Sequence, residues 1–255
     1  MLNDTVIHLW VIDAEDPSVR ATCDLGWLNQ TETGCMRACP GVRECTRYAV
    51  GRCLVRRLVG DAIGRPPARV ALDESLGGAA ARVPGGGRVV WDQGERWIAV
   101  ALTGDNPIGL EVTSLSVTGS VRPLRNAVLS AGEARWLERL SRRERPLGVA
   151  RIRALKVAWL RASGAGSETD LRAVSVLDPQ GRNTGLVSGA RGHWFVAEPV
   201  AGHGGIRVAV AGQFPASGHQ PEIRRESFVP EDAPAASSML ADSQRERLGR
   251  TGFAR

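Results

Sequence analysis

The residues best suited to chemistry in this chain of 255 residues are one glutamate, one lysine and two arginines. Glu111 interrupts the apolar run 108–112. A carboxylate in such a run is expected to be buried and to need a partner. We interpret Glu111 as a candidate general acid or base with a raised pKa, or as a metal ligand. The alternative is a glutamate that is paired with an arginine at the edge of a cleft.

Lys156 is the only lysine among the 33 lysine and arginine residues. It is a candidate anchor for a phosphate or carboxylate, or a nucleophilic amine if it is desolvated. An ordinary exposed helix lysine is the alternative. Arg153 and Arg161 lie four residues before and four after Val157, so on a helix they share one face. They are candidate phosphate ligands, and a solvated basic stripe is the alternative.

Trp91 and Trp97 are candidates to line an apolar ligand pocket, because seven tryptophans are many beside four phenylalanines. Packing in the core is the alternative for both. All five cysteines lie between positions 23 and 53. An odd number without paired CxxC motifs favours free thiols over a disulfide framework or a zinc site.

The elements that must position these residues follow from hydrophobic periodicity. Helical spacing predicts helices over 43–63, 126–140 and 149–162. Ser130 and Glu133 form a candidate capping box for the second of them. Apolar and β-branched runs predict strands over 6–12, 69–72, 88–91, 97–103, 108–112, 171–177, 193–200 and 206–211.

This order of elements predicts an α+β fold built of two similar halves. We place the seam near residue 105, with an N-terminal lobe over 1–105 and a C-terminal lobe over 106–215. Residues 216–255 are polar and rich in proline, serine and charge. They are predicted to be a mostly disordered tail.

Five short patterns follow one another along the chain. They are the strand 7–10, the arginine-rich helix 43–56 with its Gly-Arg-Pro-Pro break at 64–67, the segment Ile-Gly-Leu-Glu-Val-Thr at 108–113, the helix 130–140 and the helix 153–166. In this order they resemble the Sfp-type 4'-phosphopantetheinyl transferases over residues 6–212. The last pattern aligns without gaps to that family's W-x-x-K-E-A-x-x-K-x-x-G-x-G helix. The resemblance implies two α/β lobes in a pseudo-two-fold arrangement, the 4'-phosphopantetheinyl transferase fold.

The family holds Mg²⁺ with two carboxylates on its central strand and the glutamate of the K-E-A motif. Those positions are Glu111, Thr113 and Val157 here, so only one carboxylate remains. Mg²⁺ prefers an octahedral set of oxygen ligands, and we expect no metal unless a residual site persists at Glu111.

The residues that bind coenzyme A in the family are also changed. The segment that takes its 3'-phosphate corresponds to 92–95, which carries two acids, and the lysine of the G-K-P loop is missing at 77–79. The family's second helix lysine corresponds to Arg161. Arg47, in the arginine-rich helix, is a further candidate phosphate ligand. We therefore expect no cofactor, and coenzyme A with Mg²⁺ only if the family's activity is retained.

Three hypotheses share this resemblance. The first is a repurposed, metal-independent enzyme of a secondary-metabolite pathway (polyketide or nonribosomal peptide), acting on a small or carrier-bound intermediate with Glu111 in acid/base chemistry. The second is a divergent active transferase that moves phosphopantetheine from coenzyme A to a carrier-protein serine. The third is a non-catalytic module that binds an acyl or peptidyl carrier protein. Whether the chain is an enzyme therefore stays open at this point.

Composition limits the partners further. The net charge of +6 favours an acidic partner, but no basic run is interleaved with aromatics, so nucleic acid is not expected. No apolar run is long enough to cross a membrane, and the first residues do not form a secretory signal. We expect a cytoplasmic protein. The preference for arginine, glycine and alanine is typical of a GC-rich, actinobacterial genome.

Overall fold

The computed structural model describes residues 2–74, 79–114, 127–166, 168–178, 180–182, 185–187, 194–201, 206–213 and 219–230. It is a mixed α/β structure whose chain falls into two compact units. The first unit comprises Met1–Ile12 and Ala71–Ser227 and holds both sheets; the second comprises Asp13–Val70 and Phe228–Arg255.

A five-stranded sheet in the first unit has the strand order β2-β3-β4-β1-β8. Two antiparallel pairs join β2 to β3 and β3 to β4, whereas β8 runs parallel to β1. These strands are β1 (Val6–Asp13), β2 (Ala80–Arg82), β3 (Arg88–Gln93), β4 (Trp97–Thr103) and β8 (Glu222–Glu226). The strands that the sequence predicts over 6–12, 88–91 and 97–103 are thereby confirmed.

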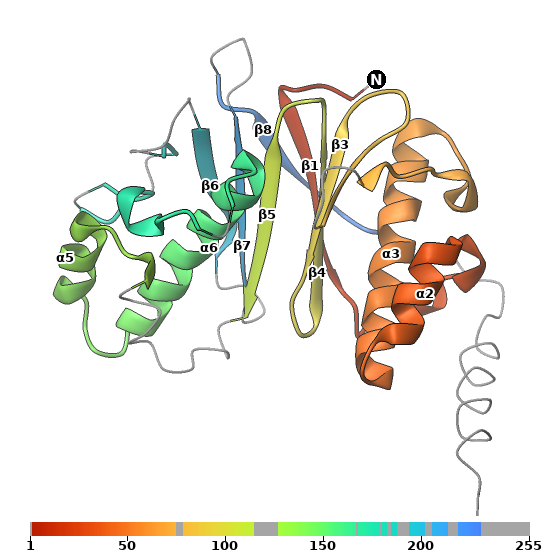
Figure 1. Ribbon diagram of the computed structural model, residues 1–255, viewed down its shortest axis with the longest axis horizontal. Coiled ribbons are helices and arrows are strands. Elements are labelled where there is room, and N and C mark those ends of the chain that lie inside the picture. The colour runs from red at the N-terminus through yellow and green to blue at the C-terminus, as the bar shows by residue number, and fades with distance from the viewer. Residues whose placement is uncertain are drawn as a thin grey trace, which may run out of the picture. The chain divides into compact units, whose positions relative to one another are not determined.

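A three-stranded antiparallel sheet in the same unit has the order β5-β7-β6, so β5 is an edge strand. Its strands are β5 (Ile108–Ser114), β6 (Trp194–Ala201) and β7 (Ile206–Gln213). One face of this sheet packs against the five-stranded sheet through apolar side chains. The other face is covered by the long helix α6 (Arg145–Ser163), as Figure 1 shows. The predicted strands and helix in this region are confirmed.

The helix α5 (Ala131–Arg139) packs on α6 and begins with the predicted capping box. The side chain of Ser130 accepts a hydrogen bond from the Glu133 N–H, and the Glu133 carboxylate accepts one from the Ser130 N–H. These two bonds satisfy backbone donors that the first turn of a helix otherwise leaves without partners. α6 ends at Gly164, whose φ of 65° lies in the left-handed region that glycine adopts without strain.

The helices described in the second unit are α1 (Pro17–Ala21), α2 (Gln30–Ala38) and α3 (Val42–Ile63), with short 3-10 turns at Leu25–Trp27 and Pro67–Arg69. α2 is fixed to α3 by an ion triad, in which Glu32 accepts hydrogen bonds from Arg52 and Arg56. All three side chains are almost fully buried. α3 confirms the helix predicted over 43–63.

Two predicted strands are wrong. Residues 171–177 begin with a 3-10 turn at Leu171–Ala173, because the Asp170 side chain accepts the Arg172 N–H and caps that turn. Residues 69–72 begin with the last residue of another 3-10 turn, Pro67–Arg69, in which proline at the first position favours the turn over a strand. Both segments were predicted as strands because they are rich in apolar residues, and this composition does not distinguish a strand from a buried turn.

The predicted tail contains one strand. Residues 222–226 form β8, whose register with β1 pairs Val6 with Glu222 and Trp10 with Glu226. Residues 231–255 lie outside the described residues. The predicted seam near residue 105 falls between β4 and β5, which belong to the same compact unit. Compactness and internal repetition are different criteria, so the division into two similar lobes stays a prediction.

Candidate functional site

The site is built on β5, whose alternating pattern sends successive side chains to opposite faces. Ile108, Leu110 and Val112 pack into the core between the two sheets. Gly109 and Glu111 therefore face α6. A Cβ atom on Gly109 would lie 2.1 Å from the carbonyl oxygen of a residue in α6, so glycine here allows the helix to approach the strand closely.

Glu111 is only 4% exposed and is held by two arginines of α6. Its Oε1 atom accepts a hydrogen bond from Arg153 Nη1 at 2.9 Å and one from the Thr113 hydroxyl at 3.3 Å. Its Oε2 atom lies 2.9 Å from Arg161 Nη1. The structure therefore brings together three of the residues that the sequence singles out.

Asp92, at the end of β3, is the fourth charged member of this group. Its Oδ2 atom lies 3.1 Å from Arg161 Nη1 and accepts the Val112 N–H at 2.6 Å. Because β5 is an edge strand, its backbone groups need such partners on the side without a neighbouring strand. We call Asp92, Glu111, Arg153 and Arg161 the Glu111 cluster.

The two arginines of the Glu111 cluster remain accessible. The side chains of Arg153 and Arg161 are 37% and 42% exposed, whereas the carboxylate between them is buried. Half-exposed guanidinium groups that neutralise a buried carboxylate can also take up a phosphate or carboxylate of a ligand. The arrangement therefore combines two accessible guanidinium groups with a buried acid.

The pKa of Glu111 is raised above its ordinary value. Burial is the main cause, because a desolvated carboxylate disfavours its charged form. The charge of Asp92 acts in the same direction, whereas Arg161 and Arg153 oppose it. The carboxylate is therefore paired with arginines, as the alternative interpretation of Glu111 predicts. Its pKa is raised, and its role in acid/base chemistry stays a prediction.

The donor set at Glu111 does not fit the magnesium ion that the resemblance implies. Both carboxylate oxygens of Glu111 already contact guanidinium groups, Thr113 donates its hydroxyl to one of them, and Val157 offers no ligand atom. Within the described part of the chain, no three or more histidine, cysteine or acidic side chains gather so that they can hold a metal ion. At the position that the resemblance assigns to the 3'-phosphate of coenzyme A, this chain has the carboxylate of Asp92, which contacts Arg161 and would repel a phosphate.

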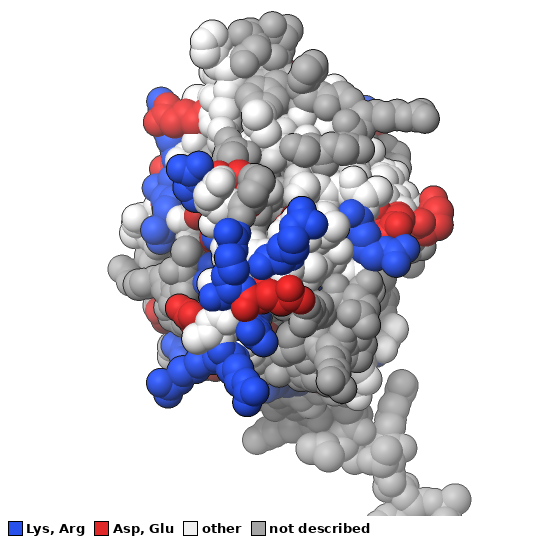
Figure 2. All heavy atoms as spheres, turned by 90° about the vertical axis from the view of Figure 1, so that its left-hand side faces the viewer, with Lys and Arg blue, Asp and Glu red and all other residues white. Residues whose placement is uncertain are grey.

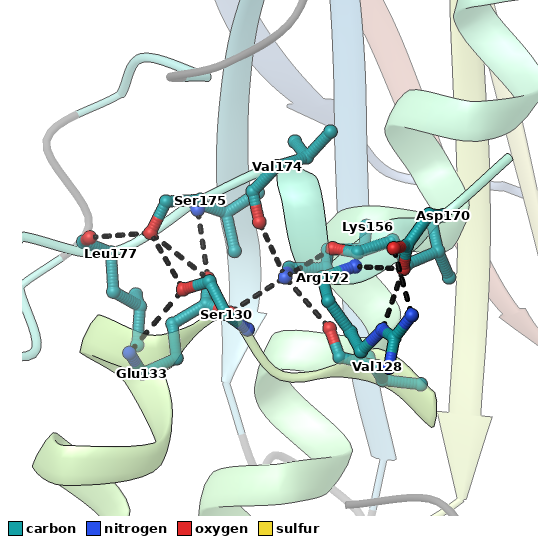
Figure 3. A network of polar contacts seen from close by, with 11 residues as sticks. Val128, Ser130, Glu133, Lys156, Asp170, Arg172, Val174, Ser175 and Leu177 are labelled. Atoms are coloured by element: carbon teal, nitrogen blue, oxygen red, sulfur yellow. Dashed lines mark hydrogen bonds and ion pairs between the residues drawn. The ribbon is translucent and has the colours of Figure 1, made fainter. Parts of the chain in front are cut away.

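Lys156 lies apart from this cluster, on the side of α6 that packs against α5. It is 0% exposed, so the interpretation as an ordinary exposed lysine is wrong. Its ammonium donates to the carbonyl oxygens of Val128, Leu171 and Val174 at 2.8, 2.8 and 2.6 Å and lies 2.6 Å from Glu133 Oε2. Figure 3 shows Lys156 beside Val128, Glu133 and Val174. Burial lowers the pKa of Lys156, although Glu133 opposes the shift. With its donors engaged in this way, Lys156 is placed to stabilise the fold, and its catalytic role gains no support.

The remaining candidates are scattered. Trp91 is buried on β3, and Trp97 is half-buried on β4, where it packs against the core between the sheets. The guanidinium of Arg96 lies 5.8 Å from the Trp97 ring centroid. Arg47 lies on α3 in the second unit. None of these three candidates is part of the Glu111 cluster.

Sequence reasoning missed two residues. Asp92 was considered from the sequence only as an acid that would repel a phosphate. Its contact with Arg161 joins segments that are about 70 positions apart, and no local sequence pattern predicts such a contact. Glu133 was predicted as a helix cap but not as the partner of Lys156. The pairing of Glu133 with Lys156 could have been predicted, since a lone lysine within an apolar helix face needs a buried acceptor.

A second feature is a basic face over α5 and the turn that leads into α6. Figure 2 shows arginine side chains gathered on this side of the molecule, with acidic side chains among them. The exposed arginines of this segment are Arg135, Arg139, Arg142 and Arg143, with Glu138 and Glu144 among them. We call these four arginines the basic face.

No family model matches the chain, and no curated protein matches it. Among the helices that the structure describes, none combines the length and the apolar character needed to cross a membrane. The geometry of the site therefore has to carry the assignment of function.

Proposed function

We propose that this chain is a phosphopantetheinyl transferase-like protein of a secondary-metabolite pathway that works as a metal-independent enzyme. In this proposal it acts on a small or carrier-bound intermediate that bears an anionic group. Arg153 and Arg161 bind that group, and Glu111 exchanges a proton with the intermediate.

The order of the strands supports the likeness to the phosphopantetheinyl transferases, which implies a fold of two similar lobes. In one sheet the hairpin β3-β4 places its second strand beside β1, and in the other the hairpin β6-β7 places its second strand beside β5. A long helix follows β1 and another follows β5 along the chain. Each half therefore has a first strand, a long helix and a returning hairpin, as the resemblance implies.

The observation that carries the proposal is a carboxylate, 4% exposed, between two half-exposed guanidinium groups. An anionic group that approaches Arg153 and Arg161 competes with Glu111 for their N–H donors. Glu111 then loses neighbours that favour its charged form, so its pKa rises further and it becomes a stronger base. A proton passes from the intermediate to the Glu111 carboxylate, and binding of the anion thereby switches on the base.

Binding and chemistry can be separated in one experiment without added metal. The probes are 4'-phosphopantetheine for binding, measured by calorimetry in EDTA, and a set of acyl-loaded carrier proteins and free acids for turnover, measured by mass spectrometry. Glu111→Gln removes the competing charge, so it should bind the phosphate equally or more tightly and lose turnover. Arg153→Ala should weaken binding by about tenfold, as expected for a charge-assisted hydrogen bond.

Two results would contradict the proposal. Equal turnover by wild type and Glu111→Gln would remove Glu111 from the chemistry. A gain of the phosphopantetheine mass on an apo carrier protein, seen only with coenzyme A and Mg²⁺, would instead favour the divergent transferase.

The basic face favours a second candidate function, the binding of an acidic carrier protein without catalysis. Four exposed arginines on one short segment attract a partner of opposite charge and speed its association. Under this alternative, the double change Arg142→Glu and Arg143→Glu should abolish binding to an acyl carrier protein in a pull-down at low salt. Glu111→Gln should leave that binding intact, and loss of binding with Glu111→Gln instead would exclude the alternative.

A further inference from the structure

One nitrogen atom of Arg161 contacts three oxygen atoms from two different sheets. Its Nη1 lies 2.9 Å from Glu111 Oε2 and 3.1 Å from Asp92 Oδ2, and it donates a hydrogen bond to the Leu110 carbonyl. Two carboxylates and a carbonyl converge on a single positive group. Oxygen atoms of these kinds, converging in this way, are also the ligands that hard divalent cations prefer.

Two carboxylates that converge on one point require a positive charge between them. Burial disfavours the ionised form of Glu111, and the negative charge of Asp92 acts in the same direction. The guanidinium of Arg161 supplies that charge from α6. Because it is covalently attached to the chain, it is present in every folded molecule.

Arg153 provides a contrast within the same helix. It contacts the other oxygen of Glu111, with Arg153 Nη1 2.9 Å from Oε1. No contact between Arg153 and Asp92 is part of the described network. The two arginines lie on one face of α6 and have similar exposure, but only Arg161 bridges the two carboxylates.

We infer that Arg161 is a built-in cation, which occupies the place between Asp92 and Glu111 that a divalent metal ion would otherwise take. Its removal turns these two carboxylates and the Leu110 carbonyl into a divalent-cation site. The inference deepens the metal-independent part of the proposed function. It is tested by metal binding alone, so its failure and a failure of the proposed catalysis can be told apart.

The probe is Mn²⁺, whose free ion is counted by electron paramagnetic resonance during titration of metal-free protein. Wild type should bind it only weakly. Arg161→Ala should bind one Mn²⁺ per chain at least about tenfold more tightly, because a carboxylate pair without its cation gains most from a divalent ion. Arg153→Ala is the matched control and should resemble wild type.

Two double variants locate the gained site. Arg161→Ala combined with Glu111→Gln, and Arg161→Ala combined with Asp92→Asn, should each return to the affinity of wild type. Arg161→Gln keeps more of the side-chain packing and replaces Arg161→Ala if circular dichroism shows that the alanine variant is unfolded. Mg²⁺ should compete with Mn²⁺ in whichever of these two variants is folded.

Three results would overturn the inference. The first is equal Mn²⁺ affinity in wild type and in the folded Arg161 variant. The second is a gain in Arg153→Ala as large as that in the Arg161 variant, and the third is a gain that survives in either double variant. The last two would mean that the ion binds elsewhere on a surface made more acidic.

Discussion

The ammonium of Lys156 lies 2.6 Å from Glu133 Oε2, and neither side chain is exposed to solvent (Figure 3). Glu133 also accepts the backbone N–H groups of Ser130 and Val176 at 2.9 Å each. The pair therefore joins α6, the first turn of α5 and the segment that follows the 3-10 turn at Leu171–Ala173. A buried ion pair with this many hydrogen bonds fixes three segments in one arrangement.

Loss of the lysine should be strongly destabilising. In Lys156→Met the Glu133 carboxylate stays buried without its counter-charge, and three carbonyl groups lose their donor. We expect the free energy of unfolding to fall by about 3–5 kcal/mol in urea titrations. Arg172→Met, which removes an exposed ion pair with Asp170 nearby, is the control and should have no measurable effect. An equally small effect of Lys156→Met would show that the network is not needed for stability.

The triad in the second unit should make the protein sensitive to acid. Burial disfavours the charge of Glu32, but the Asn29 N–H and the guanidinium groups of Arg56 and Arg52 outweigh it, so the pKa of Glu32 is lowered. A carboxyl group with a lowered folded-state pKa contributes stability above its unfolded pKa, and that contribution is lost as the pH falls through the folded pKa. The protein should therefore lose stability as the pH falls below about 4.5, the ordinary value for glutamate.

Glu32→Gln tests this assignment. The variant leaves two buried guanidinium groups without their carboxylate and should lose about 3–5 kcal/mol at pH 7 in denaturant titrations. Below pH 4.5 the difference in free energy of unfolding between wild type and variant should become smaller, since Glu32 of wild type is then protonated and also lacks its negative charge. Glu15→Gln, which breaks the exposed pair with Arg43, is the control. A gap that does not depend on pH would show that Glu32 acts through packing alone.

Glu111 should show the opposite dependence on pH. Because its folded pKa is raised, the folded chain binds a proton more readily than the unfolded chain between pH 4.5 and that raised value. Wild type therefore loses stability relative to Glu111→Gln as the pH rises through this window. Unfolding titrations of both proteins at pH 4 and pH 7.5 measure the change. If the free energy of unfolding of wild type instead rises relative to that of the variant over this window, the charges of the arginines outweigh burial and the pKa of Glu111 is not raised.

Gly109 should tolerate no side chain. In Gly109→Ala the new methyl group would meet backbone atoms of α6, with the Ala158 carbonyl oxygen at 2.1 Å and the Ala162 nitrogen at 2.5 Å. Neither can move without shifting the helix, so we expect a loss of about 3 kcal/mol and weaker anion binding by Arg161. Gly132→Ala on α5 is the matched control, because nothing lies within 4 Å of its added Cβ. That variant should keep its stability or gain up to about 1 kcal/mol from the higher helix propensity of alanine.

The parts of the fold that sequence could predict are those with local periodicity. β5 and α6 carry regular patterns of apolar residues, so both elements could be predicted, as could the shared helix face of Arg153 and Arg161. Pairing of Glu111 with an arginine was one alternative, but which arginines hold it was not predicted. The contact of Asp92 with Arg161 depends on how two sheets pack, which no local pattern encodes. The burial of Lys156 was missed for the same reason, since its four acceptors come from three separate segments.

β8 has a practical consequence for handling the protein. It covers one side of β1 in parallel register, and the side chains of His8 and Glu226 join the two strands through a contact of 2.7 Å between Nδ1 and Oε1. If the chain is shortened before residue 219 to remove its polar end, β1 becomes an open edge with unpaired backbone groups. Such a protein would tend to self-associate strand to strand. Truncation should therefore begin after Ser227, which removes residues 228–255 and leaves β8 beside β1.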